Sequence, residues 1–280
     1  MLIKRLLRPV AHSYWRIANR LDIWRGHRGK HIVICGYPRS GTSLLYNMIA
    51  ASIEGFQCEE FETEAVQRLH RRGSFVTKFP LDVLSIEQIL RANTLSKDIY
   101  FLLLIRDVRD LITSRHPQVP DRYFIGYKSS LWPLDPRFAK WNYNAPGIEA
   151  VHNAIRDCAS RRDIRTLQIR YETLVTDTDA VQRQIEDFLG VKFPESFADY
   201  DRRPHKHVYK YTGRYQAKDA SLARESSRVD SKRVAKWRNP EHREVLQQQF
   251  SQHPELFQIL IDEGYEQDAG WFSSIAGTAM

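Results

Sequence analysis

Short apolar runs alternate along this chain with longer segments in which apolar residues recur at helical spacing. Short runs that are continuously apolar, or that alternate in polarity, predict strands. We expect strands over 31–35, 74–79, 99–105 and 165–171. Apolar positions three and four apart predict helices after residue 43 and over 149–162, 179–189 and 254–263. Strands that alternate with helices predict an α/β fold of three layers, with a central parallel sheet flanked by helices.

Two regions between these elements have no regular pattern, Pro117–Gly147 and Tyr200–Asp230, and both are rich in proline, aromatic and basic residues. Long loops in a compact α/β domain are often where ligands bind. Because we find no internal repeat or linker, we expect one domain over 1–280. It would comprise a basic helical arm over 1–29, a core over 31–194, and a basic loop followed by helices over 200–280.

The chain of 280 residues is 42% hydrophobic and carries a formal net charge of +8. This balance favours an anionic ligand, polymer or membrane surface without choosing among them. Three scattered cysteines predict neither a disulfide framework nor a zinc site, so we expect a reducing, cytoplasmic setting. Without an apolar run of membrane-spanning length or a signal-peptide pattern, the basic arm 1–29 is expected to pack on the domain, with peripheral membrane contact as the alternative.

The stretch ICGYPRSGTSLLYNMI, Ile34–Ile49, joins the first predicted strand to a helix through a glycine-containing turn. Such a turn presents backbone N–H groups and the positive end of a helix dipole to an anion. Gly36 and Gly41 allow a close approach of the backbone, and Arg39 adds a forked cation. Hydroxyl donors are expected from Ser40, Thr42 and Ser43.

The lysine of a nucleoside-triphosphate loop is replaced by Thr42. This replacement disfavours a magnesium-dependent ATP or GTP site and favours a less highly charged anion, such as a phosphate or sulfate group, bound without metal. A cysteine-phosphatase site is also disfavoured, because the spacing from Cys35 to Arg39 is too short for an arginine cradle around a thiolate. We expect Cys35 to be a small buried residue.

A second anion site is predicted where the third strand ends. Arg106 lies at the carboxyl end of that strand, the edge at which open α/β sheets bind ligands. Ser114 is expected two turns into the following helix. The pair suggests a ligand with two separated anionic groups. The alternatives are an ion pair of Arg106 with Asp107 or Asp110, and a solvated Ser114.

The motifs GYPRSGTSLL, RDVRDLITS, IRYETL and DFLGV occur in the order found in sulfotransferases that use 3′-phosphoadenosine 5′-phosphosulfate (PAPS), and the chain resembles that family over 31–194. The resemblance implies a P-loop-like fold with the phosphosulfate on the Arg39–Ser43 loop and no metal. Arg106 and Ser114 would hold the 3′-phosphate, and Tyr171 would lie near the adenine. The product would be 3′-phosphoadenosine 5′-phosphate (PAP).

A weaker match at KRVAKWRN, 232–239, places Lys232 and Arg233 where the family caps the 3′-phosphate, although the usual Arg-Lys-Gly is absent. Phe79 stands where the cytosolic phenol and steroid branch has a catalytic histidine. The chain is therefore more similar to the bacterial and Golgi-type branch that acts on carbohydrates and tyrosylproteins.

Sulfuryl transfer needs a base for the acceptor proton and positive charge on the leaving group. The resemblance implies Glu60 as the base. Its neighbour Glu59 is a second candidate, and a solvated acidic run over 59–64 is the alternative to both. Lys78, at the end of the second strand, would steady the sulfuryl group, and Arg39 would stabilise the leaving group. His116 is a minor candidate for the base.

The irregular regions suggest the acceptor. Aromatic faces suit sugar rings and cations suit carboxylates or sulfates, so we expect a hydroxyl on a saccharide, with an acidic saccharide as one form. The alternative is that the aromatic residues pack the loop onto the core. The residues concerned are Arg122, Tyr123, Phe124, Tyr127, Lys128, Trp132, Arg137, Lys140, Trp141, Tyr143, Arg202, Arg203, Lys206, Lys210, Arg214 and Lys218.

Other functions stay open from the sequence alone. A protein or small-molecule hydroxyl or amine is an alternative acceptor, and an NTP-dependent kinase is an alternative enzyme. A third alternative is a non-enzymatic protein whose positive charge binds membranes or nucleic acid. We expect no nucleic-acid partner, and the sequence does not assign an oligomeric state.

Overall fold

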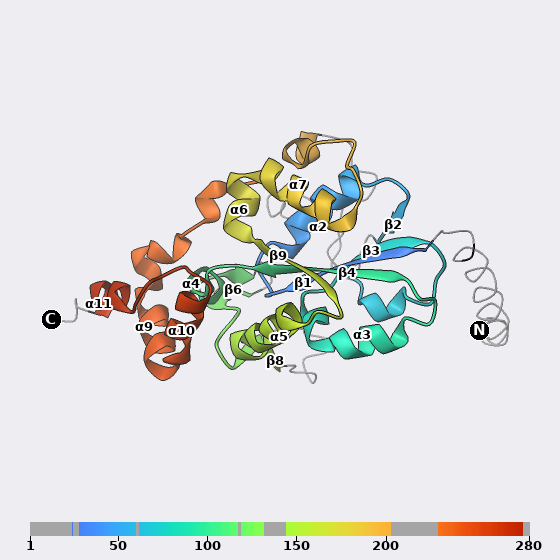
Figure 1. Cartoon of the computed structure of the whole chain (residues 1–280). Helices are drawn as coiled ribbons and strands as arrows, with labels where there is room; N and C mark the ends of the chain where they lie inside the picture. The colour runs from blue at the N-terminus through green and yellow to red at the C-terminus, as the bar shows by residue number, and fades with distance from the viewer. Residues whose placement is uncertain are drawn as a thin grey trace.

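The structure is a computed structural model that describes residues 24, 28–59, 62–116, 119–131, 144–202 and 229–276. Its centre is a five-stranded sheet with the strand order β2-β3-β1-β4-β9, and all neighbouring strands are parallel (Figure 1). The strands in chain order are β1 (Lys30–Gly36), β2 (Phe56–Cys58), β3 (Ser74–Lys78), β4 (Asp98–Ile105) and β9 (Arg165–Arg170).

Alternate residues of the central strands supply two hydrophobic cores, because successive side chains of a strand point to opposite faces. Ile32 and Ile34 of β1 pack in the core on one face, and Val33 and Cys35 pack in the core on the other. Both faces are buried, which explains why β1 is continuously apolar over 32–35.

Helices cover both faces of this sheet, as Figure 1 shows. One face carries α2 (Thr42–Ser52), α6 (Tyr171–Thr176) and α7 (Thr178–Leu189), and the other carries α3 (Ile86–Ala92) and α5 (Ile148–Ser160). The prediction of a three-layer α/β fold is confirmed.

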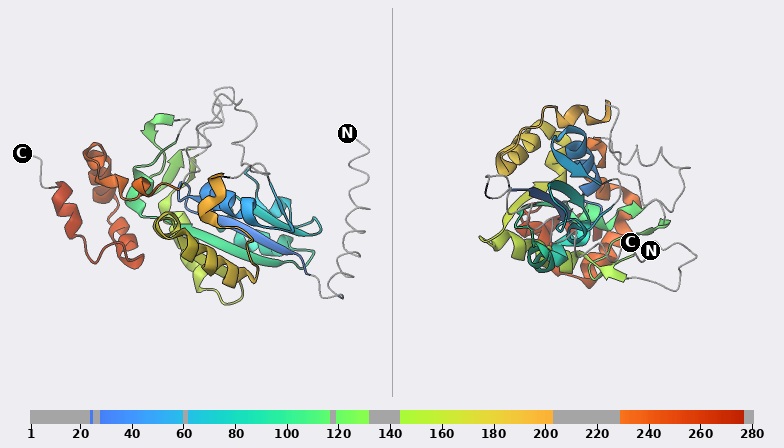
Figure 2. Two further views of the ribbon diagram at one scale, coloured as in Figure 1. Left: turned by 90° about the horizontal axis from the view of Figure 1, so that it is seen from above. Right: turned by 90° about the vertical axis from the view of Figure 1, so that its right-hand side faces the viewer.

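The C-terminal helices lie beyond one end of the sheet (Figure 2). This end carries the carboxyl ends of the strands, because α4 (Val108–Ile112) directly follows β4 and contacts two of these helices. The helices are α9 (Arg243–Gln252), α10 (Glu255–Asp262) and α11 (Gly270–Ala276).

Most predicted elements agree with the structure to within one or two residues. The predicted helix over 179–189 corresponds to α7 and ends at Gly190, which has the left-handed conformation (φ 60°) that glycine adopts readily. Strand β2 was not predicted because it has only three residues. The last predicted strand ends one residue early, since Tyr171 begins α6.

The predicted irregular region 117–147 contains short antiparallel pairs. Strand β5 (Arg115–His116) pairs with β6 (Val119–Tyr123), and β7 (Ser129–Leu131) pairs with β8 (Asn144–Pro146). Short 3₁₀ turns complete the described chain at η1 (Ala65–Gln67), η2 (Pro80–Ser85), η4 (Phe197–Arg202), η5 (Ser231–Arg233), η6 (Lys236–Arg238) and η7 (Pro240–His242).

The prediction that Ser114 lies two turns into a helix is wrong, because α4 ends at Ile112. The Thr113 hydroxyl donates to the carbonyl of Arg109 (2.8 Å), and the Ser114 amide donates to the carbonyl of Leu111 (3.0 Å). These bonds satisfy carbonyl groups at the helix end and close it after a short run. Ser114 therefore follows the helix and immediately precedes β5.

The predicted basic arm, 1–29, lies mostly outside the described residues. At its end, Arg28 pairs with Asp98 at 3.4 Å. No helix within the described residues has the length and apolar character needed to cross a membrane.

Candidate functional site

The loop between β1 and α2 depends on two glycines with positive φ. A Cβ on Gly36 (φ 128°) would lie 2.2 Å from the carbonyl oxygen of Leu104, and a Cβ on Gly41 (φ 94°) would lie 2.5 Å from Cδ2 of Tyr171. Neither distance is compatible with a larger residue. The glycines therefore let the loop lie directly against β4 on one side and against the Tyr171 ring on the other.

Ser40 shapes this loop from within. Its amide and its hydroxyl both donate to the carbonyl of Tyr37, at 3.2 and 2.6 Å, and the residue is fully buried. Its predicted contact with an anion stays a prediction.

The N-terminus of α2 has the features of an anion site. Gly41 at its N-cap provides no side-chain acceptor, and the first turn contains no acidic residue. The first amides of a helix have no acceptor within the helix, so a phosphate or sulfate oxygen can accept from them. Thr42 is buried and Ser43 is half-buried at this turn.

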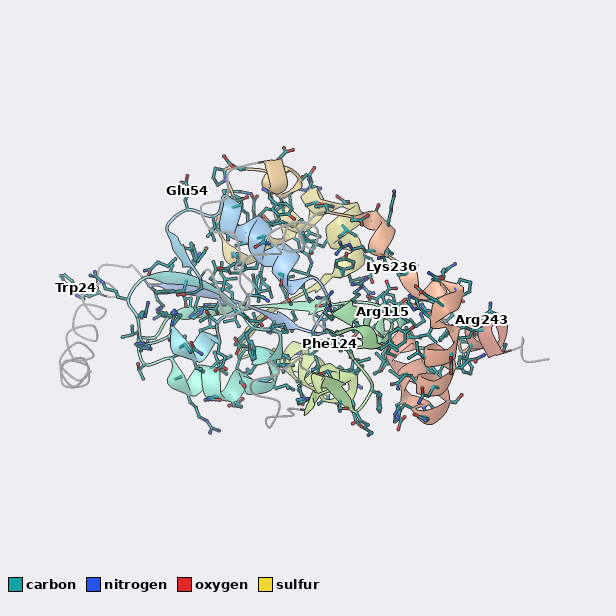
Figure 3. The ribbon with its side chains drawn as sticks, turned by 180° about the vertical axis from the view of Figure 1, so that it is seen from behind. Trp24, Glu54, Arg115, Phe124, Lys236 and Arg243 are labelled. Carbon is teal, nitrogen blue, oxygen red and sulfur yellow. The ribbon has the colours of Figure 1, made fainter. Side chains whose placement is uncertain are left out.

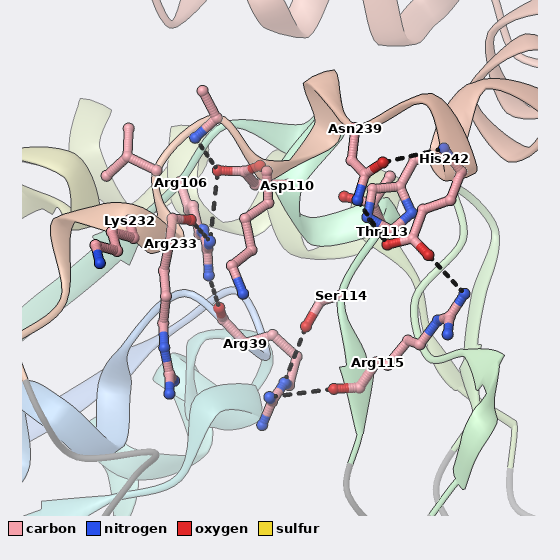
Figure 4. A pocket seen from close by; sticks show the side chains of 14 residues that line it. Arg39, Arg106, Asp110, Thr113, Ser114, Arg115, Lys232, Arg233, Asn239 and His242 are labelled. Carbon is pink, nitrogen blue, oxygen red and sulfur yellow. Dashed lines mark hydrogen bonds and ion pairs between the residues drawn. The ribbon is translucent and has the colours of Figure 1, made fainter.

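Arg39 brings the two predicted anion sites together (Figure 4). Its Nε donates to the Ser114 hydroxyl at 3.1 Å, and its Nη2 donates to the carbonyl of Arg115 at 3.3 Å. The residue itself has positive φ (67°), an uncommon conformation outside glycine. The loop and the segment after α4 are thus in direct contact.

Arg106 connects the same loop to a distant part of the chain. It donates from Nη1 to the carbonyl of Arg39 (3.0 Å) and from Nη2 to the carbonyl of Arg233 (2.7 Å). Its guanidinium lies 4.1 Å from the ring centre of Tyr171, a cation–π contact. The buried Nε has no hydrogen-bond partner in the described structure.

The predicted alternative for Arg106, an ion pair, is also present. Nη2 lies 3.4 Å from Oδ2 of Asp110, whereas Asp107 pairs with Arg109 at 2.7 Å. Burial raises the pKa of the Asp110 carboxyl, while Arg106 and the amide of Trp237 act in the opposite direction.

Arg39, Arg106 and Ser114 line a pocket of about 520 Å³. Six of its described lining residues are Lys or Arg and two are acidic, so the pocket favours an anionic ligand. In Figure 3, Arg115 and Lys236 lie together between the sheet and the C-terminal helices, far from Trp24. The described lining comprises Arg39, Arg106, Asp110, Thr113, Ser114, Arg115, Lys232, Arg233, Val234, Ala235, Lys236, Asn239, Glu241 and His242.

Sequence reasoning found part of this lining. Lys232 and Arg233 were predicted and do face the pocket with Arg39, Arg106 and Ser114. Arg115, Lys236, Asn239, Glu241 and His242 were missed. The available signal was their position in the chain: Arg115 directly follows Ser114, Lys236 and Asn239 belong to KRVAKWRN, and the other two lie just after that motif.

Lys78 lies at the carboxyl end of β3 and is only 4% exposed. Its ammonium forms an ion pair with Glu62, a carboxylate of the acidic run that the sequence did not single out. The run is therefore not simply a solvated surface, because at least this member contacts a buried cation at the edge of the sheet.

The two candidate bases differ in what the structure says of them. Glu59 accepts hydrogen bonds from Nε and Nη2 of Arg68, and these bonds lower the pKa of its carboxyl. Its carboxylate is thus committed to a structural ion pair. Glu60 lies outside the described residues and stays a prediction, as does a role for His116, whose side chain is not described.

Cys35 is fully buried, and burial raises the pKa of its thiol well above the ordinary value. This position does not favour a thiolate nucleophile. The expectation of a small buried residue is in agreement with its place in the core.

Part of the aromatic set predicted for an acceptor packs into the core instead. Phe124 and Tyr127 are 2% and 4% exposed and belong to the core on the α5 face. The Tyr123 hydroxyl lies 3.1 Å from Nδ1 of His242. The remaining aromatic and basic candidates in 132–143 and 203–228 lie outside the described residues, and the side chains of Arg122 and Arg202 are not described.

Comparison with protein families matches residues 29–258 to the sulfotransferase domain. The chain belongs to this family, since the match covers most of its length. Family membership supports sulfuryl transfer as the general activity.

Three solved structures are similar to the chain at low identity. The sulfotransferase domain of the Synechococcus PCC 7002 olefin synthase is 18% identical, with a TM-score of 0.47 over 76% of this chain and 89% of that one. The sulfotransferase domain of the curacin biosynthetic pathway is 15% identical, with a TM-score of 0.45 over 76% of this chain and 91% of that one. Mouse sulfotransferase SULT7A1 complexed with PAP is 14% identical, with a TM-score of 0.41 over 80% of this chain and 84% of that one. A comparison with curated proteins gave no significant match.

Proposed function

We propose that this protein transfers a sulfuryl group from PAPS to the hydroxyl of an acceptor. The observation that carries the proposal is the contact of Arg39 with Ser114, beside Arg106, in one cationic pocket. It joins a helix N-terminus suited to one anion with a second group of cations suited to another. A ligand with two separated anionic ends fits this arrangement, and membership of the sulfotransferase family supports sulfuryl transfer.

The residues present fit such a donor. The α2 N-terminus and Arg39 would hold the phosphosulfate, and Arg106 with Ser114 would hold the 3′-phosphate. The buried Arg106 Nε, which has no partner in the described structure, is a donor that a phosphate oxygen could satisfy. Lys232 and Arg233 add positive charge at the same end of the pocket.

The family resemblance implies that Tyr171 lies near the adenine. Its buried ring packs against Gly41 and against the Arg106 guanidinium, so it supports the groups proposed for both anions from behind the pocket lining. Burial raises the pKa of its hydroxyl, which keeps the residue neutral.

PAPS supplies a sulfuryl group already activated by its bond to phosphate. The chain's own contribution would be electrostatic and positional: Arg39 and the first amides of α2 stabilise the negative charge that develops on the departing phosphate. Glu60 would accept the acceptor's hydroxyl proton. Lys78, held at the sheet edge by Glu62, would place a cation near the transferred group.

We propose a saccharide hydroxyl as the acceptor, with an acidic saccharide as one form. The support is compositional, because 132–143 and 203–228 combine aromatic residues with Lys and Arg. Phe79, in place of the histidine of the phenol and steroid branch, favours the bacterial and Golgi-type branch. A protein or small-molecule hydroxyl or amine is the second candidate acceptor.

The test is transfer of labelled sulfate from PAPS to a panel of acceptors, with and without a metal chelator. The proposal expects labelled product in both conditions and none when ATP with magnesium replaces PAPS as the labelled donor. Labelled transfer from ATP that the chelator abolishes would instead favour a kinase.

A further inference from the structure

A short segment after the 203–228 region crosses the pocket and carries three of its cations. We call residues 231–237 the strap. Lys232, Arg233 and Lys236 all belong to it and all line the pocket. The strap comes from a part of the sequence far from the loop and from α4, so something in the fold must hold it at this place.

We propose that Asp110 is a positioning residue that anchors the strap on the pocket. The inference rests on the proposed function, because the strap matters as a set of ligands for an anionic donor. Asp110 lies on α4, and its side chain is fully buried.

The anchor consists of two backbone hydrogen bonds from the strap to one carboxylate. The amide of Ala235 donates to Oδ2 of Asp110 at 2.9 Å, and the amide of Trp237 donates to Oδ1 at 3.0 Å. Ala235, the first of the two donors, has a left-handed conformation (φ 57°), which turns the backbone so that amides two residues apart reach the same side chain. A carboxylate with two acceptor oxygens matches this pair of donors.

Arg106 extends the anchor to the phosphate-binding loop. Its Nη2 is 3.4 Å from Oδ2 of Asp110 and 2.7 Å from the carbonyl of Arg233, and its Nη1 donates to the carbonyl of Arg39. Figure 4 shows this chain of contacts running from the strap through Arg106 to the loop. Asp110 thus orients Arg106 as well as the strap.

An acidic residue that lines an anion pocket would ordinarily weaken binding by repulsion. Here the carboxylate is enclosed by two amides and a guanidinium, so its charge is compensated within the protein. The benefit is that the strap cations are already in place before the ligand arrives, which lowers the ordering cost of binding.

The decisive variant is Asp110→Asn, because asparagine has nearly the same shape but only one acceptor atom. In either orientation its amide NH₂ would face a donor, which is the Trp237 amide at the Oδ1 position, or the Ala235 amide and the Arg106 guanidinium at the Oδ2 position. We expect the dissociation constant for PAP, measured by calorimetry, to rise at least about tenfold. Asp98→Asn, at the opposite edge of the sheet, removes the same charge and is expected to leave PAP binding unchanged.

A double-mutant cycle separates positioning from a general loss of stability. Replacing Lys232 and Arg233 together by alanine should weaken PAP binding in the wild-type background, but have little further effect once Asp110→Asn has released the strap. Effects that multiply independently would overturn the inference, and so would unchanged binding by folded Asp110→Asn.

Hydrogen–deuterium exchange of the wild-type protein provides a test without any variant. The amides of Ala235 and Trp237 should be protected in the ligand-free protein, and rapid exchange at both would overturn the anchor. This readout is independent of the proposed function, which would fail separately if the wild-type protein bound no PAP.

Discussion

Carboxylates at the edge of the sheet differ in role because each has a different neighbour. Glu59 pairs with Arg68, and Glu62 pairs with the buried Lys78. A carboxylate whose pKa is lowered by an arginine is a weak proton acceptor. Glu59 and Glu62 are thus both held in ion pairs, and Glu60 stays the base that we propose.

The prediction at this position compares adjacent residues. Glu60→Gln should lower sulfuryl transfer by about 100-fold or more, since it removes general-base catalysis, and should leave PAP binding intact. Glu59→Gln is the matched control and should leave turnover close to that of the wild type. Turnover from labelled PAPS and calorimetry with PAP measure the two effects, and the opposite ranking of the two variants would reassign the base.

At the scale of elements, the site depends on how β1 passes into α2. Gly36 is next to the backbone of Leu104, because β1 and β4 are paired along their whole length up to that point. The turn that forms the proposed anion site is therefore also part of the sheet's packing.

Gly36→Ala should lower the free energy of unfolding by about 3 kcal/mol or more, because a Cβ there meets a backbone oxygen that cannot move aside. Gly55→Ala is the control, since Gly55 also has positive φ (76°) but has no atom within 4 Å of the added Cβ. It should cost only about 1 kcal/mol. Denaturant unfolding measures both, and equal losses would show that steric contact at Gly36 is unimportant.

The sequence predicts the longer elements well because their burial is continuous. Strand β1 is continuously apolar over 32–35 and β4 over 99–105, and α7 has a clear apolar face with a glycine stop. The early end of α4 is less predictable, because it depends on the Thr113 hydroxyl bonding back to Arg109 rather than on a proline or glycine.

At the scale of the whole molecule, stability should depend on pH through His31. This histidine is buried in β1, where its Nε2 lies 2.9 Å from the Thr77 hydroxyl and its Nδ1 has no partner in the described structure. Burial, with smaller effects from Lys97 and Arg68, lowers its pKa from 6.5 to about 3. Its neutral form is therefore strongly favoured in the folded state.

Because the unfolded chain binds this proton more readily, His31 contributes stability that is full well above pH 6.5 and is lost as the pH drops toward 3. At about pH 5.5 this contribution should be about 1.4 kcal/mol smaller than at pH 8. His31→Gln should lose less stability than the wild type between these conditions. Denaturant unfolding at both pH values measures the difference, and an identical pH dependence of the two proteins would contradict the assignment.

The part of the site that directly follows the strands could be predicted from the sequence, and the way the strap is held could not. Arg39 and Arg106 were found from the sequence because parallel strands end at one edge, so residues that follow β1 and β4 must meet there. The anchoring of the strap by Asp110 could not be predicted from the sequence, since it depends on backbone amides of Ala235 and Trp237 that no side-chain pattern reveals.

We propose that one pocket binds both anionic ends of the donor. The most direct measurement is calorimetric titration with PAP in the absence of metal, on the wild type and on Arg39→Ala and Arg106→Ala. We predict micromolar-range binding to the wild type that is lost in each variant, because each removes a cation from a different part of the pocket. No binding by the wild-type protein, or binding that survives both substitutions, would contradict the account.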